Sequence, residues 1–77
     1  MTTYHIHFNG LVQGVGFRPL VCRLAKKYNI TGTVCNANTG VHIECTAATQ
    51  LVQAFYKSII ESPPPNAIIT GHSIRVI

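Results

Sequence analysis

The chain has 77 residues, of which 47% are hydrophobic and 10% are charged, with a formal net charge of +4. This length predicts one small domain over residues 1–77, and the composition excludes a disordered chain. No apolar run approaches the roughly 20 residues of a membrane-spanning helix and no signal-peptide pattern opens the chain, so we expect no membrane partner and a cytoplasmic location.

The first half of the chain predicts a strand, a helix and a hairpin. Residues 3–10 alternate between apolar and polar side chains, as in a half-buried strand with Tyr4, Ile6 and Phe8 on one face. Residues 19–28 have helical spacing, with a proline suited to the first turn and Asn29 as a stop. Two strands follow at residues 31–36 and 40–46, joined by a turn at "NANTG".

The second half predicts a helix and a final strand. The helix covers residues 48–61 and ends at "SPPP". Its apolar face is expected to contain Leu51, Val52, Phe55 and Ile59. Residues 67–77 form the last strand, in which Gly71 indicates an irregularity.

This order of elements predicts an α+β fold of the ferredoxin-like βαββαβ type. Each helix has one apolar stripe and each strand has one apolar face. The simplest arrangement that buries them all places both helices on one face of a four-stranded antiparallel sheet.

The glycine-rich stretch "GLVQGVGFR", residues 10–18, joins the first strand to the first helix. Consecutive backbone N–H groups in such a turn can form a concave anion site, and the helix N-terminus adds partial positive charge. A guanidinium at this junction can bind a phosphate or carboxylate through two donors. The alternative is a tight turn whose glycines serve backbone geometry alone. We predict a phosphate-binding site formed by Gln13, Gly14, Val15, Gly16, Phe17 and Arg18.

The stretch "GLVQGVGFR" is very similar to the acylphosphatase signature G-x-V-Q-G-V-x-F-R, and "GTVCNANTGVHIE" (residues 32–44) resembles the second motif of that family. The resemblance covers essentially the whole chain. It implies that Arg18 and the loop amides bind the phosphoryl group of an acyl phosphate, and that Asn36 holds the attacking water. These two residues are therefore the expected catalytic residues. No cofactor and no metal ion are expected.

The spellings "VGFRP" and "VCN" look more like the N-terminal domain of the hydrogenase-maturation carbamoyltransferases, the HypF family. That resemblance implies an excised domain that hydrolyses carbamoyl phosphate, with other domains of a parent protein and hydrogenase-maturation proteins as partners. One alternative is a free-standing acylphosphatase that acts on acyl phosphates in general. A further alternative is a non-catalytic module that binds phosphate or docks on partners. Ala37 follows Asn36 at a position where some relatives carry a polar residue, which leaves open how firmly the water site is held.

Three other interpretations receive less support from the residues. Nucleic-acid binding is not expected, because the predicted third strand offers no aromatic platform. His5, His7 and His42 are expected to share the outer sheet face, where surface residues are commoner than a metal site. A metal chaperone would need a CxxC motif, which this chain lacks. We therefore expect the cysteines to be buried or half-buried free thiols: Cys22, Cys35 and Cys45.

Overall fold

Two helices and four strands follow one another in the predicted order, in a computed structural model that describes residues 1–77. The strands are β1 (Thr2–Leu11), β2 (Thr31–Ala37), β3 (Gly40–Ala47) and β4 (Ile68–Val76). The helices are α1 (Phe17–Lys27) and α2 (Thr49–Glu61). No helix in the chain has the length and apolar character that crossing a membrane requires.

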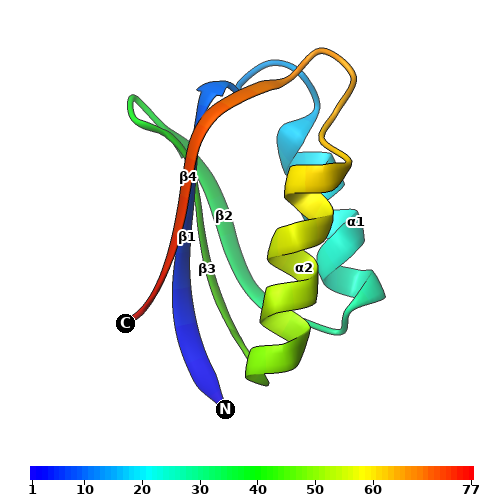
Figure 1. The fold of residues 1–77 in the computed structure, drawn as a ribbon, viewed down its shortest axis with the longest axis vertical. Coiled ribbons are helices and arrows are strands. Elements are labelled where there is room, and N and C mark those ends of the chain that lie inside the picture. Colours follow the sequence, from blue (N-terminus) through cyan, green and yellow to red (C-terminus); the bar gives the residue numbers. More distant parts are fainter.

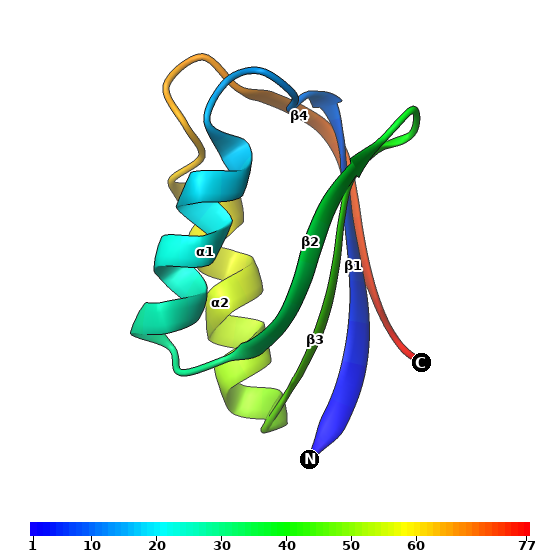
Figure 2. The same cartoon turned by 180° about the vertical axis from the view of Figure 1, so that it is seen from behind.

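The strands form one antiparallel sheet in the order β2-β3-β1-β4. Both helices cover one face of this sheet, and the other face carries no helix (Figures 1 and 2). The predicted ferredoxin-like class is therefore confirmed. The loop that follows β1 and the start of α1 lie at the same end of the molecule as the β2–β3 hairpin turn (Figure 2).

The core lies between the sheet and the helices, where the alternation of the strands places their apolar side chains. Tyr4, Ile6 and Phe8 of β1 are buried, as predicted. β3 contributes every second residue in the same way, and α2 contributes Val52, Phe55 and Ile59. The prediction was wrong for Leu51, which is 40% exposed because it lies beside the row of residues that α2 turns toward the sheet.

Helix α1 begins at Phe17, two residues earlier than predicted. Gly16 precedes it with φ 84°, a left-handed conformation that turns the chain into the helix. The proline at position 19 still lies in the first turn, where its missing N–H removes no hydrogen bond of the helix. The helix ends at Lys27, and Asn29 adopts φ 56° just beyond it, which confirms the predicted stop.

The β2–β3 hairpin is tighter than "NANTG" indicates. Ala37 pairs with Gly40, so only Asn38 and Thr39 remain in the turn. Asn36 lies within β2, opposite Val41, and is not a turn residue. Its orientation is therefore set by the sheet rather than by turn geometry.

The other predicted irregularity is confirmed. The register between β1 and β4 shifts at Asn9 and Gly10, whose partners are Gly71 and Ile69. Thr70 is thus the extra residue of a β-bulge, next to the glycine that indicated it.

The cysteines differ from the prediction at two of three positions. Cys45 of β3 is buried, and this burial raises the pKa of its thiol. Cys22 and Cys35 are exposed. Cys35 alternates onto the outer sheet face opposite His42, which explains its exposure.

Candidate functional site

The loop between β1 and α1 has a backbone that favours glycine at two positions. Gly14 adopts φ 73° and Gly16 adopts φ 84°, both in the left-handed region. A Cβ atom added at either position would meet no atom within 4 Å. These glycines are therefore required by backbone conformation and not by packing, and the space above them is open to a ligand.

The backbone N–H groups of this loop have no acceptor inside the protein. Among the backbone hydrogen bonds of the turns, loops and helix ends, none is donated by residues 14–18, and the first donor in this region is Leu20, which bonds to Gly16. The first turn of a helix always leaves such donors free, and the helix dipole adds partial positive charge there. The loop and the helix start thus present a run of unpaired donors.

Both ends of the loop are fixed in the core. Val12 is 1% exposed and Phe17 is 2% exposed. The Phe17 ring packs against Phe8 of β1, with 5.4 Å between the ring centroids. The five residues between β1 and α1 are therefore anchored on both sides, and the run of donors is held in place.

A pocket of about 240 Å³ lies over these donors. Arg18, the second residue of α1, and Asn36 of β2 both line it. The structure thus brings together two side chains that belong to different elements and lie 18 positions apart in the sequence. The complete lining consists of Val12, Gly14, Gly16, Phe17, Arg18, Pro19 and Asn36.

The charge of this pocket is positive. Arg18 is its only ionisable side chain, because the two acidic residues of the chain, Glu44 and Glu61, do not line it. Both Arg18 and Asn36 are exposed, so an incoming ligand can reach them. A guanidinium, unpaired amides and an absence of carboxylates suit an anion with several oxygens.

Two predicted phosphate-binding residues do not line the pocket. The side chain of Gln13 donates instead to the backbone oxygen of Ala37. Val15 packs its side chain against the core, so only its backbone N–H is free for a ligand. Phe17 lines the pocket while its ring lies in the core.

Sequence reasoning missed two lining residues, Val12 and Pro19, and it missed the contact of Gln13. The helical pattern offered a signal for Pro19, because a residue in the first turn lies close to any ligand at the helix N-terminus. Nothing in the sequence indicated that Gln13 reaches the β2–β3 hairpin.

A second pocket, of about 210 Å³, lies between α1 and β2. Its walls are largely apolar and include Val21, Ala25, Val34, Ile43 and Phe55. The chemistry of the molecule therefore favours the glycine-rich loop as the functional site.

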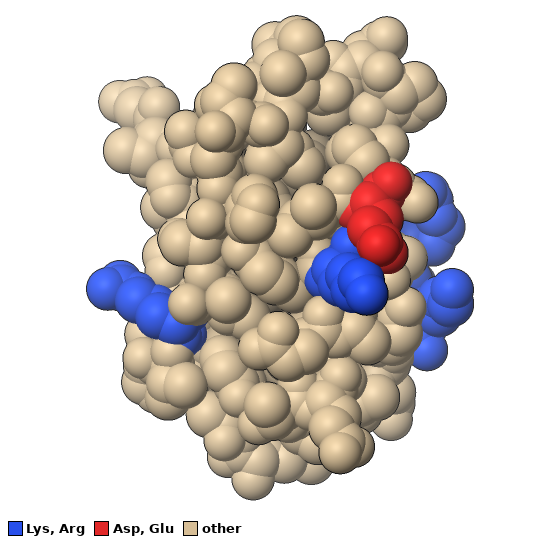
Figure 3. Space-filling model, in the orientation of Figure 1, with Lys and Arg blue, Asp and Glu red and all other residues tan.

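The basic residues are distributed unevenly over the surface. Figure 3 shows most of the visible lysine and arginine side chains on the side of the helices, beside an acidic side chain. According to the strand register, Arg75 and Glu44 are the only Lys, Arg, Asp or Glu residues on the outer sheet face, and their charges have opposite signs. No broad basic surface covers that face.

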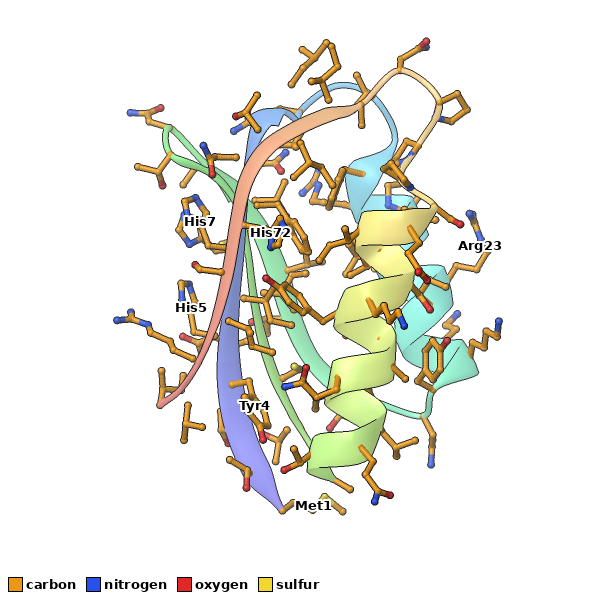
Figure 4. The ribbon with its side chains drawn as sticks, viewed as in Figure 1. Met1, Tyr4, His5, His7, Arg23 and His72 are labelled. Atoms are coloured by element: carbon orange, nitrogen blue, oxygen red, sulfur yellow. The ribbon has the colours of Figure 1, made fainter.

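Three histidines share the outer face, as predicted. Figure 4 shows His5 and His7 pointing away from the helices, whereas His72 lies on the side of α2. The His42 ring stacks between the other two, with centroid distances of 4.4 Å to His7 and 5.1 Å to His5. Nδ1 of His42 shares a hydrogen bond of 2.9 Å with Nε2 of His5. No group of three ligands in the chain is placed to hold a metal ion.

This cluster predicts a loss of stability in acid. Desolvation, followed by the neighbouring charges of His7 and His5, lowers the pKa of His42 below its ordinary value of 6.5. The unfolded chain then binds the proton more readily, so the stability contributed by His42 is complete above about pH 6.5 and falls as the pH drops through that value. We expect His42→Gln to lose less unfolding free energy between about pH 7.5 and pH 5.5 than the wild type does.

Urea unfolding at the two pH values measures this difference. His72→Gln provides the control, because His72 bonds to Tyr56 on the other side of the sheet and lies outside the cluster. An equal acid-induced loss in the wild type and His42→Gln would contradict the prediction.

Comparisons with known proteins agree with this architecture. Residues 4–77 match the family model described as Acylphosphatase. A curated acylphosphatase from Staphylococcus aureus (strain Newman) is 39% identical over 73 residues, which cover 92% of this chain and 82% of that protein.

Two solved structures extend the comparison. The crystal structure of full-length HypF in the phosphate- and nucleotide-bound form matches with a TM-score of 0.96 and 38% identity, over 99% of this chain and 10% of that one. This chain thus spans about a tenth of that HypF chain. The crystal structure of acylphosphatase from Bacillus subtilis matches with a TM-score of 0.91 and 32% identity, over 100% of this chain and 86% of that one.

Proposed function

This chain belongs to the acylphosphatase family, and we propose that it hydrolyses an acyl phosphate in the pocket over residues 14–18. One observation carries the proposal. The free amides of residues 14–18, the Arg18 guanidinium and the Asn36 carboxamide meet at a single pocket, although Asn36 comes from a separate strand.

The amides and the guanidinium bind the phosphoryl group and stabilise its transition state. Phosphoryl transfer spreads negative charge over the equatorial oxygens, and donors fixed in advance stabilise that charge without reorganising. Arg18 supplies two parallel donors from the helix start. The loop supplies the amides of residues 14–18.

Asn36 orients the attacking water. A carboxamide can accept a hydrogen bond from water through its oxygen while its NH₂ group donates elsewhere. The water oxygen forms a bond to phosphorus, the bond from phosphorus to the acyl oxygen breaks, and the carboxylate leaves with the bonding electrons. No carboxylate or histidine lines the pocket, so the proton of the water passes to a phosphoryl oxygen of the substrate. The leaving carboxylate is stable, which is why a covalent nucleophile is not required.

Two candidate substrate classes differ in the identity of the acyl group. The free-standing relatives, of which this chain covers 82% and 86%, favour acyl phosphates in general. The high structural similarity to HypF supports carbamoyl phosphate and a place in hydrogenase maturation as the second candidate. Sequence analysis put carbamoyl phosphate first, and the relatives favour the reverse order.

Phosphate release from acetyl phosphate and carbamoyl phosphate tests both. We expect the protein to accelerate the hydrolysis of acetyl phosphate clearly above the rate in buffer. A preference for carbamoyl phosphate of more than about tenfold in kcat/KM would favour the second candidate. Tight binding of inorganic phosphate without turnover of either substrate would contradict hydrolysis and identify a binding module.

A further inference from the structure

Gln13 connects the two halves of the proposed site. Its Nε2 atom donates to the backbone oxygen of Ala37, the residue that directly follows Asn36 in β2. Gln13 belongs to the glycine-rich loop, directly before Gly14. This is the only side-chain hydrogen bond between that loop and the β2–β3 hairpin.

The sheet does not provide this connection by itself. The loop continues from β1, and the sheet order places β3 between β1 and β2. β2 is an edge strand, and all of its residues are exposed except the half-buried Val34. The ladder places Asn36 in line with Val41 and Phe8. The separation between Asn36 and the loop amides also depends on contacts outside the ladder, such as the hydrogen bond of Gln13.

The acceptor of this hydrogen bond is itself well fixed. Ala37 pairs with Gly40 across the hairpin. The backbone oxygen of Thr39 accepts a hydrogen bond of 2.6 Å from Nε2 of His7 in β1. The hairpin end is thus held from the outer face by His7, and Gln13 holds it from the side of the loop.

Two pockets adjoin this contact. Asn36 lines the Arg18 pocket, and Gln13, Asn38 and Thr39 line a polar pocket of about 350 Å³. A side chain at this place can set how closely β2 approaches the loop without contacting the phosphoryl group. Its own carboxamide does not line the Arg18 pocket.

We propose that Gln13 is a positioning residue, which holds Asn36 at the distance from the loop amides that hydrolysis requires. This inference rests on the proposed function. If the attacking water is displaced by about 1 Å from its productive position, turnover falls strongly although the phosphoryl site stays intact. Gln13 therefore acts on kcat, and Arg18 and the amides determine the affinity for phosphate.

Gln13→Met tests this proposal, because methionine has a similar length, carries no charge and offers no N–H donor. We expect kcat for acetyl phosphate to fall by about tenfold or more. The inhibition constant of inorganic phosphate should stay within about twofold of the wild-type value. The side-chain NH₂ signals of Asn36 in a ¹⁵N NMR spectrum should shift, and the thermal midpoint should change little because Gln13 is exposed.

Gln53→Met is the matched control, since Gln53 is an exposed glutamine on α2 that lies outside the site. An unchanged kcat in Gln13→Met would overturn the proposal, and so would a parallel loss of phosphate affinity, which would place Gln13 in the anion site. A wild-type protein without acyl phosphate hydrolysis would instead overturn the proposed function. The two failures are therefore distinguishable.

Discussion

Replacing Arg18 with alanine is expected to reduce kcat/KM for acetyl phosphate by about 10³-fold or more, because the substitution removes the only charged donor of the pocket. A bidentate guanidinium contact stabilises both the bound phosphate and the transition state. Inhibition by inorganic phosphate should weaken together with activity. Steady-state phosphate release, with and without added phosphate, measures both effects.

Arg23→Ala is the control for this substitution. Arg23 is exposed on the same helix, five positions after Arg18, and it does not line the pocket. Both variants lose one positive charge, so any general effect of net charge on anion capture appears equally in both. Comparable activity in the two variants would exclude Arg18 from the site.

Replacing Asn36 with alanine should reduce kcat by about 10²- to 10³-fold, with little change in phosphate affinity, because Asn36 orients water and does not hold the phosphoryl group. The side chain is exposed and lies on an edge strand, so the fold should persist. Turnover numbers and phosphate inhibition constants, measured on the same preparation, separate the two effects.

Asn38→Ala is the matched control, because Asn38 lies in the hairpin turn two residues later and lines the neighbouring pocket instead. It should retain wild-type turnover. Wild-type kcat in Asn36→Ala would remove the water-orienting role from the mechanism and leave the anion site intact.

The pattern of the sequence predicts the fold because each element obeys one period. Alternation in residues 3–10 correctly placed Tyr4 and Phe8 in the core, and the helical spacing after Pro19 correctly predicted the covering helix. The start of α1 was misplaced because a left-handed Gly16 turns the chain, which hydrophobic spacing does not record. Leu51 was misassigned because a position beside the buried row still fits the apolar periodicity.

The candidate site was predictable in part. The glycines and Arg18 indicate an anion site, because of their chemistry and their place at the start of a helix. The meeting of Arg18 with Asn36 depends on how β2 lies against the first helix, and only the family resemblance indicated it. The contact between Gln13 and Ala37 is a tertiary contact of one flexible side chain, so no local pattern encodes it.

Several interpretations of the sequence stay predictions. These are the excised-domain origin, the partners in hydrogenase maturation and the cytoplasmic location. The absence of nucleic-acid binding likewise stays a prediction, although no Phe, Tyr or Trp lies on the outer sheet face.

The position of β3 between β1 and β2 links catalysis to the assembly of the sheet. A partly folded chain in which β1 has paired with β4 alone would contain the anion loop but would lack a correctly placed Asn36. Turnover then requires that the β2–β3 hairpin has paired with β1, which brings together residues far apart in the sequence, such as Phe8 and Val41. Recovery of enzymatic activity after dilution from denaturant would accordingly report completion of the sheet, which recovery of helix content alone does not report.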